Sequence, residues 1–433
     1  MSLSARALAL SLLCEMDEKN GFANLLLSDA VVKKAAEEAP FLTALFYGCA
    51  ERKLTLDYLL GHFAQRSVDE ISRRVRFILH IGLYQIFFMK IPHHAAVSET
   101  VSLAVGQGER GFVNAVLRAA VRAGEMPLPP RERTARHLSV LYSFPLSTVK
   151  RFLALFGKED TEALLSYFNT PLALCLRARN GETKAALLSR FEKDGVRAES
   201  APYAPFSVRV LSSAPVRELY GFDEGLFFVQ DEASAIATEA LDAREGDTVI
   251  DVCACPGGKT FGAAFSAGGK GNFYAFDLHE SKLPLIAEGA KRLSLAVTVR
   301  EVDATLGDDT FDGRADRVIC DVPCSGFGVL GKKPDLRYRE VNGELPPLQY
   351  EIMCRSARYL KRGGVMVYST CTLLPEENEQ NVRRFLSEHG DFVPEDFEVA
   401  GEKTVRSEGG MLTLLPHKHG CDGFFVARLR KIR

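Results

Sequence analysis

The chain has 433 residues, of which 46% are hydrophobic and 25% are charged, and its formal net charge is −2. A chain of this length and composition can fill two or three hydrophobic cores, so we expect several folded domains. The small net charge excludes a chain-wide attraction to nucleic acid, so a nucleic-acid surface would have to be a local patch. No run reaches the roughly 18 apolar residues that a membrane span requires.

Cysteine usage points to a reducing environment. The ten cysteines include no C-x-x-C pair, which argues against a zinc site, and they lie in apolar runs rather than in a loop-rich framework. We therefore expect no bound metal and a cytoplasmic location. Acidic residues directly follow the first apolar run, Ala7 to Cys14, which favours an amphipathic helix over a signal peptide.

Residues 1–125 are predicted to form an all-helical domain. Apolar residues recur at helical spacing in ARALALSLLCEM, PFLTALFYGCAERKLTLDYLL and RRVRFILHIGLYQIFFMK. The simplest interpretation is a helical bundle that serves packing or docking. Basic side chains on it are candidates for phosphate contacts, although a solvated helix face explains each of them equally well: Arg66, Arg73, Arg74, Arg76 and Arg118.

Residues 126–225 are predicted to be a basic linker followed by a small α+β subdomain. The run GEMPLPPRERTAR is rich in proline and arginine, which is typical of a stiff connection between domains. The clustered Arg177, Arg179, Lys184, Arg190 and Arg197 could flank a polyanion or could be ordinary surface charge.

Residues 226–433 are predicted to be an α/β domain built on a mostly parallel, doubly wound sheet. Short apolar runs alternate with helix-length segments, and each run ends in polar residues: TVIDVCACPGGKT, NFYAFDL, VTVREVD, DRVICDVPCSG and VMVYSTCT. Ligands of such sheets bind beyond the carboxyl ends of the strands. We therefore expect all of these strand ends to belong to one site.

The first strand ends predict a nucleoside-binding site. The glycines of the C-P-G-G-K turn let the backbone approach a ligand, and the helix that follows offers free amide groups. Asp277 could accept the two hydroxyls of a ribose, and Asp303 an adenine amine, although a tight turn and two capping residues would look the same. The spacing is not G-x-G-x-x-G, which favours S-adenosylmethionine over a dinucleotide. The predicted cofactor residues of the turn are Cys253, Ala254, Cys255, Pro256, Gly257, Gly258 and Lys259.

Two further strands end in thiols, at Cys324 and Cys371. A structural cysteine normally lies within a strand, as Cys320 does, so this pair favours covalent catalysis. Carbon 5 of cytosine is too electron-poor to attack a methyl sulfonium, but a thiolate added at carbon 6 turns the ring into an enamine that can. Asp321 would supply the proton that ring nitrogen 3 takes up. The thiolate requires a lowered pKa, to which Lys259 could contribute.

The motifs resemble those of a known family. DVCACPGGKT, DVPCSGFGVLGKKPDLRYR, YSTCTLLPEENEQNV and LLPHKHGCDGFFVARLRK are similar to the motifs of the NOL/NOP/Sun family of RNA 5-methylcytosine methyltransferases. Residues around GERGFVNAVLR resemble the NusB-like RNA-binding fold. Together they imply a Rossmann-like, S-adenosylmethionine-dependent enzyme that methylates carbon 5 of a cytosine in bacterial 16S ribosomal RNA through a covalent cysteine–cytosine adduct, as a monomer without DNA or membrane partners.

The resemblance also implies residue roles. Cys371 would be the nucleophile, Cys324 would assist release of the product, and Asp321 would hold the base close to the cofactor. The segment from Gly331 to Arg339 would lie beside the RNA backbone, and its basic side chains suit phosphate: Lys332, Lys333, Arg337 and Arg339. The sequence departs from the family pattern at Cys255, at Arg179 and at Tyr338, none of which belongs to the catalytic pair.

Other classes remain open at this point. A small-molecule or protein methyltransferase would share the cofactor half but would not need both thiols. A DNA cytosine methyltransferase would use the thiol of the P-C motif and lack the S-T-C element. A non-catalytic RNA-binding protein would explain the helical front alone. Because a stacked base cannot be attacked on its face, a cytosine substrate would have to be unpaired or extruded.

Overall fold

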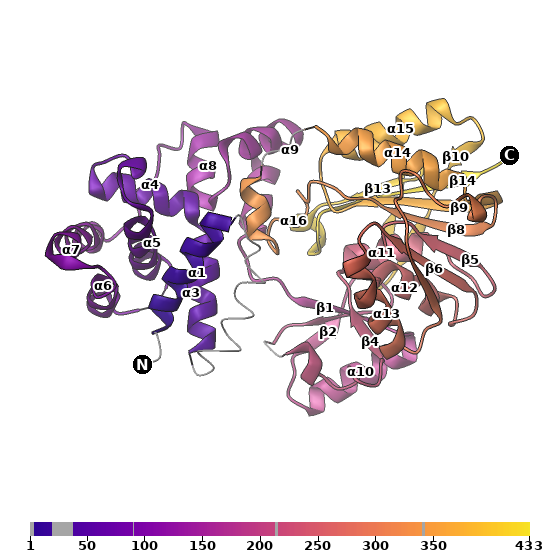
Figure 1. The fold of residues 1–433 in the computed structure, drawn as a ribbon, viewed down its shortest axis with the longest axis horizontal. Coiled ribbons are helices and arrows are strands. Elements are labelled where there is room, and N and C mark those ends of the chain that lie inside the picture. Colours follow the sequence, from indigo (N-terminus) through magenta and orange to yellow (C-terminus); the bar gives the residue numbers. More distant parts are fainter. Residues whose placement is uncertain (1–3, 20–37, 90, 213–214, 340–342) are drawn as a thin grey trace. The chain divides into compact units, whose positions relative to one another are not determined.

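A computed structural model describes residues 4–19, 38–89, 91–212, 215–339 and 343–433. The chain divides into two compact units (Figure 1). The first contains residues 1–170 together with 330–340, and the second contains residues 171–329 and 341–433. Within the described residues, no helix is both long enough and apolar enough to cross a lipid bilayer.

The first unit is all-helical. Its elements are α1 (Ala5–Lys19), α3 (Ala39–Glu51), α4 (Lys53–Ala64), η1 (Val68–Glu70), α5 (Arg73–Phe87), α6 (His93–Val101), α7 (Gly106–Ala123), α8 (Thr134–Tyr142), α9 (Leu146–Tyr167) and the 3-10 turn η5 (Pro334–Tyr338). Helix α7 shows why the sequence folds this way. It buries Val113, Val116, Leu117 and Ala120, which share one face at helical spacing.

The helical unit extends beyond the boundary that we predicted at residue 125. The Thr55 hydroxyl in α4 donates to the carbonyl of Val140 in α8 at 2.6 Å, and the Ser143 hydroxyl accepts the Leu54 amide at 3.1 Å. Helices α8 and α9 therefore belong to the helical unit, whereas the proline-rich run predicts a separation that these contacts override.

The second unit begins with a small antiparallel sheet. Its strands β1 (Leu174–Ala178), β2 (Ala198–Ser200), β3 (Ser207–Val210) and β4 (Phe227–Val229) are arranged in the order β2-β3-β1-β4, and α10 (Gly181–Lys193) packs on them. A core around Leu176, Leu187 and Phe227 holds these parts together. The predicted α+β subdomain is therefore residues 171–229 rather than 126–225.

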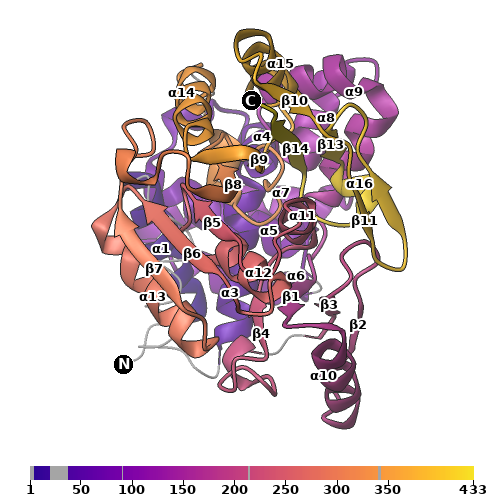
Figure 2. The same ribbon diagram turned by 90° about the vertical axis from the view of Figure 1, so that its right-hand side faces the viewer.

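A larger, mostly parallel sheet forms the rest of the second unit. Its spatial order is β10-β14-β9-β8-β5-β6-β7, as Figure 2 shows for the central strands. The parallel strands are β5 (Thr248–Asp251), β6 (Asn272–Asp277), β7 (Val297–Glu301), β8 (Ala315–Asp321) and β9 (Leu360–Thr370). Strand β14 (Phe424–Lys431) pairs antiparallel with β9. Strands β10 (Phe392–Pro394) and β13 (Met411–Leu414) each pair antiparallel with β14.

Helices cover both faces of this sheet. Alternate strand residues such as Val249 and Ile319 pack with α11 (Glu232–Ala240) and α12 (Gly258–Ser266). Their neighbours Ile250 and Val318 pack on the other face with α14 (Leu345–Ala357) and α15 (Glu379–Glu388). The remaining elements are α13 (Leu283–Arg292), α16 (Pro416–His419), the strand pair β11 (Glu398–Ala400) and β12 (Thr404–Arg406), and the short turns η2 (Val216–Glu218), η3 (Glu280–Lys282), η4 (Asp309–Phe311) and η6 (Pro375–Glu377).

The strand order confirms the predicted doubly wound fold. Strand β5 lies between β6 and β8, so the chain winds outward in one direction from β5 to β7 and in the other direction from β8 to β9. The carboxyl ends of β5 and β8 meet at this reversal, which is where open α/β sheets bind their ligands.

Candidate active site

The turn after β5 approaches the ligand edge with its backbone. Gly257 has φ +107°, a conformation that favours glycine, and α12 starts directly after it at Gly258. A Cβ built on Gly258 would lie in ordinary van der Waals contact with Gln230 at 3.7 Å and Phe228 at 3.9 Å, so the backbone of this turn lies close to its neighbours. The first amides of α12 have no partner within the helix, which suits them to bind an anionic group.

Two carboxylates at the neighbouring strand ends fit a nucleoside. Asp277 ends β6, and its two oxygens accept the backbone amides of Cys255 and His279, each at 3.2 Å. Each oxygen has two acceptor sites, so one on each is left for a ribose hydroxyl. Asp303 follows β7 and accepts the amide and the hydroxyl of Thr305, which lowers the pKa of its carboxyl group.

The end of β8 carries a short polar network. The Lys259 ammonium lies 2.7 Å from Asp321 Oδ2, and the Ser369 hydroxyl donates to Asp321 Oδ1 at 2.6 Å. Behind it, the Thr260 hydroxyl donates to Asp251 at 2.7 Å, and burial raises the pKa of Asp251 to about 7. Asp321 is thereby fixed from both sides at the edge of the sheet.

The two predicted strand-end thiols are neighbours. The sulfur of Cys324 lies 3.2 Å from the sulfur of Cys371, because β8 and β9 pair in parallel with Asp321 opposite Ser369. The hydrogen bond to Cys371 and burial both raise the pKa of Cys324. The raised pKa favours the protonated form of Cys324, whose thiol can then donate a hydrogen bond to the Cys371 sulfur.

Sequence reasoning overlooked several residues that order this edge. In the sequence Ser369 stands out only as part of the S-T-C motif, yet the strand register places it opposite Asp321. Glu377 and Asn378, from the P-E-E-N run, are buried and bond to the residues beside the two cysteines. The feature of the sequence that could have indicated this role is their position shortly after the S-T-C strand end.

One predicted RNA contact is not available in this fold. Arg337 is 1% exposed, and its guanidinium donates to Leu330 O, to Phe168 O and to Asn169 Oδ1 at 2.7–2.9 Å. It also lies 4.6 Å from the ring centre of Phe144. The prediction of a phosphate contact by Arg337 is therefore wrong in this structure, since its donors are used inside the helical unit.

The remaining basic candidates differ in their surroundings. Lys332, Lys333 and Arg339 are exposed. Arg73 pairs with Glu18 at 2.7 Å, and Arg74 pairs with Glu109 at 3.1 Å.

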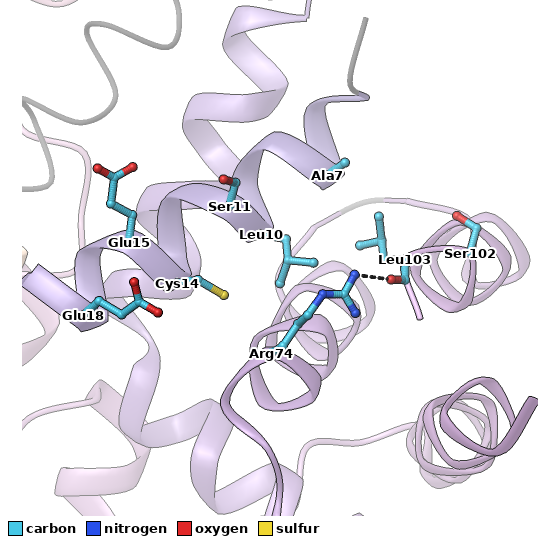
Figure 3. A pocket seen from close by; sticks show the side chains of 9 residues that line it. All are labelled: Ala7, Leu10, Ser11, Cys14, Glu15, Glu18, Arg74, Ser102 and Leu103. Atoms are coloured by element: carbon cyan, nitrogen blue, oxygen red, sulfur yellow. Dashed lines mark hydrogen bonds between the residues drawn. The ribbon is translucent and has the colours of Figure 1, made fainter. Parts of the chain in front are cut away.

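Figure 3 shows Arg74 at the edge of a hollow of about 760 Å³ beside α1, where it donates to Leu103 O at 2.7 Å. Glu15 and Glu18 line the same hollow, so it carries more acidic than basic side chains. In the small sheet, Arg177 is buried against Glu239, and Arg179 donates to Leu293 O at 2.7 Å. Neither arginine flanks a polyanion surface.

Known protein families match residues in both units. The family model described as 16S rRNA methyltransferase RsmB/F matches residues 238–430, and the NusB family model matches residues 3–122. The "Probable ribosomal RNA small subunit methyltransferase B" of Bacillus subtilis is 34% identical, and the match covers 99% of each chain.

Solved structures share the fold. The crystal structure of PH0851 matches with a TM-score of 0.78 at 24% identity and covers 100% of both chains. NSun6 from Pyrococcus horikoshii, crystallised with SFG, matches with a TM-score of 0.59 at 23% identity over 68% of this chain and 100% of that one. The chain thus belongs to the ribosomal RNA small subunit methyltransferase B family and is an rRNA small subunit methyltransferase with S-adenosylmethionine as its cofactor.

Proposed function

We propose that the enzyme methylates carbon 5 of a cytosine in 16S ribosomal RNA through a covalent adduct between Cys371 and carbon 6 of the base. The observation that carries this proposal is the pair of sulfurs, 3.2 Å apart, beside the Lys259–Asp321 pair at the ligand edge. Methylation of a ring nitrogen, an exocyclic amine or a ribose hydroxyl requires no nucleophilic thiol, and it would leave both thiols without a role.

The residues divide the reaction into balanced steps. The Cys371 thiolate bonds to carbon 6, and ring nitrogen 3 takes up a proton that the Lys259 ammonium, 2.7 Å from Asp321, supplies through the Asp321 carboxylate. The ring electrons now make carbon 5 nucleophilic. When bound, S-adenosylmethionine supplies the electrophilic methyl group that carbon 5 attacks.

Release reverses the addition. The proton on carbon 5 passes to water, the bond between carbon 6 and the Cys371 sulfur breaks, and nitrogen 3 returns its proton through Asp321 to Lys259. The Cys324 thiol, whose sulfur lies 3.2 Å from that of Cys371, donates a hydrogen bond that stabilises the departing thiolate. The pKa of Cys324 is raised, which keeps that proton on Cys324 for this step.

Cofactor and RNA would be held by separate parts of the chain. We propose that the turn from Cys253 to Lys259, together with Asp277 and Asp303, binds S-adenosylmethionine. The proposed phosphate contacts belong to the helical unit: the exposed Lys332, Lys333 and Arg339, together with Arg73 and Arg74. The target cytosine must leave its stack to reach both sulfurs.

The test is transfer of a labelled methyl group to deproteinised 16S ribosomal RNA and to 30S particles, followed by nucleoside analysis. The expected product is 5-methylcytidine at one position. The proposal fails if no label reaches cytosine in either substrate, or if the label appears on another base or on ribose.

Two cysteine variants test the covalent step. Cys371→Ala should lower transfer by at least about a thousandfold, the order of loss expected for a missing nucleophile. Cys324→Ala should accumulate an RNA–protein adduct that survives denaturing electrophoresis. Cys354→Ser, a half-buried cysteine on α14, serves as the control and should transfer methyl groups normally. Normal turnover by Cys371→Ala would exclude the covalent mechanism.

A further inference from the structure

We infer that Glu377 and Asn378, the last residue of η6 and the residue after it, act together as positioning residues that hold the sulfurs of Cys324 and Cys371 beside each other. This inference rests on the proposed covalent mechanism and names the residues that set its geometry. Glu377 and Asn378 are 0% and 1% exposed, so neither reaches solvent. Each of them bonds to the residues that flank one of the two cysteines.

Glu377 fixes the loop that carries Cys324. The amide of Ser325, the residue after Cys324, donates to Glu377 Oε2 at 2.9 Å. Gln349 on α14 donates from one amide nitrogen both to the same carboxylate oxygen and to the carbonyl of Pro323, each at 2.8 Å. Cys324 is thus held by backbone hydrogen bonds on both of its sides.

Asn378 does the same for Cys371. Its side-chain oxygen accepts the Thr370 hydroxyl at 2.6 Å, and its side-chain nitrogen donates to the carbonyl of Thr372 at 3.0 Å. Thr370 and Thr372 are the two neighbours of Cys371. Both oxygen and nitrogen of the amide are used, so the orientation of this side chain is fixed.

Further bonds tie the two loops to each other and to the sheet. The hydroxyls of Ser325 and Thr372 lie 2.8 Å apart, and the Tyr368 hydroxyl donates to the carbonyl of Glu377 at 2.6 Å. Because Glu377 and Asn378 are adjacent in the chain, a displacement of one cysteine loop is opposed by bonds to the other. The 3.2 Å sulfur separation follows from this arrangement.

A role in packing alone would not call for a polar side chain here. Burying a charged group without a cation is costly, and an apolar side chain of similar volume would pack the same space. Among the described residues, Glu377 Oε1 has no hydrogen-bond partner. The hydrogen bond between Cys324 and Cys371 and burial are the main causes that raise the pKa of Cys324, and the negative charge of Glu377 is a smaller one. The side chain of Glu377 therefore serves the thiol pair mainly through the hydrogen bond that it accepts from the Ser325 amide.

The sulfur separation is measured without RNA by treating the full-length enzyme with diamide, an azo oxidant. Two thiols lose two protons and two electrons to form a disulfide, and diamide is reduced to the hydrazine. Peptide mass spectrometry reports the rate at which the Cys324–Cys371 cross-link forms. The same proteins are assayed for kcat and for KM of RNA, and their melting temperatures are compared.

Glu377→Ala and Asn378→Ala should each slow cross-linking by at least about tenfold and lower kcat by about a hundredfold, since a displacement near 1 Å has that order of effect, with KM changed less than about twofold. Glu377→Gln keeps an acceptor oxygen for the Ser325 amide and should recover most of both rates. Glu351→Ala, an exposed glutamate on α14, should match the unaltered enzyme in every measurement.

The inference is overturned if Glu377→Ala and Asn378→Ala melt like the unaltered enzyme and cross-link at its rate, or if Glu377→Gln, which keeps the volume of the side chain, cross-links as slowly as a folded Glu377→Ala. If Glu377→Ala does not fold, the cross-linking rate of Asn378→Ala tests the inference in the same way. Failure of the proposed function looks different: cross-linking would still depend on Glu377 and Asn378, while Cys371→Ala would retain methyl transfer.

Discussion

A buried cation of the helical unit and a partly buried cation of the second unit have opposite surroundings. Arg337 in the helical unit donates to Leu330 O and to Phe168 O and packs over the ring of Phe144, so its donors end on groups of the protein itself. Lys259 at the sheet edge meets Asp321, whose side chain is 30% exposed. A carboxylate that is fixed but still accessible can exchange a proton with a ligand, whereas an enclosed guanidinium can only hold the fold.

The backbone explains why Arg337 is enclosed. Helices α3 and α9 end at Glu51 and Tyr167, where the last carbonyls lack partners within the helix. Arg337 donates to the carbonyls of Phe168 and Glu51, and the Tyr338 hydroxyl donates to that of Glu51 at 2.9 Å. One arginine and one tyrosine thus satisfy the ends of two helices, an arrangement that also favours a cation.

The largest difference between the two sites should appear in catalysis. Asp321 has two side-chain partners, the Lys259 ammonium and the Ser369 hydroxyl. Lys259→Gln removes the ammonium, so of these two the carboxylate keeps the Ser369 hydroxyl. We expect kcat to fall by about a hundredfold or more, because Asp321 loses both its orientation and the ammonium that supplies the proton for ring nitrogen 3. Steady-state kinetics with 16S ribosomal RNA measure this effect.

The control for Lys259 is Lys270→Gln, an exposed lysine that pairs with Glu245 and should leave kcat unchanged. A Lys259→Gln enzyme with normal kcat would mean that Asp321 acts without its ion pair. It would contradict the catalytic role that distinguishes Lys259 from Arg337.

Arg337→Met should act on stability instead. The substitution leaves the carbonyls of Phe168 and Leu330 buried without a donor, which costs about 3 kcal/mol in such sites. Thermal melting of the full-length protein measures the loss. Arg122→Met, at an exposed position in the last turn of α7, should change stability by less than about 0.5 kcal/mol. If Arg337→Met melts like the unaltered protein but binds RNA more weakly and with less dependence on salt, Arg337 is a phosphate contact after all.

This contrast also explains what the sequence could predict. The strand runs and the rule that ligands bind at carboxyl ends were enough to bring Cys324, Cys371 and Asp321 together, since parallel neighbours end at one edge. The burial of Arg337 could not be predicted in the same way. Its charge resembles that of Lys332 and Lys333, and the helix ends that it caps lie more than 160 residues earlier in the chain.

The same limit applies to the domain boundary and to Glu377. A proline-rich run predicts a separation, but whether helices α8 and α9 stay with α4 depends on partners such as Val140, which periodicity does not identify. The P-E-E-N run is polar and would ordinarily be assigned to a solvated turn. Only the tertiary arrangement shows that Glu377 is enclosed beside Cys324.

A second enclosed group of the helical unit gives a smaller, pH-dependent effect. Burial would raise the pKa of Asp57, but hydrogen bonds from His80 and Arg76 overcome it and lower the pKa to about 2 from 3.8. Because the folded-state value is the lower one, the stabilisation is complete above about pH 4 and is lost as the pH falls towards 2. The shift corresponds to about 2 kcal/mol at neutral pH.

Asp57→Asn should therefore lower the melting temperature of the helical unit at pH 7, and the difference from the unaltered protein should shrink as the pH approaches 2. Asp69→Asn, at an exposed position in η1, should show neither effect. A deficit that stays constant with pH would assign the effect to lost packing and not to the charge of Asp57.

The smallest effect is expected for Lys333→Gln, four residues from Arg337 but exposed. One phosphate contact contributes little to affinity by itself, so RNA binding should weaken about two- to fivefold near 0.1 M salt. The slope of log affinity against log salt should decrease by about one, because one fewer counterion is released. Fluorescence anisotropy with a fragment of 16S ribosomal RNA at several salt concentrations measures both quantities. Glu351→Gln should not alter the slope, and an unchanged slope for Lys333→Gln would place the RNA backbone away from this segment.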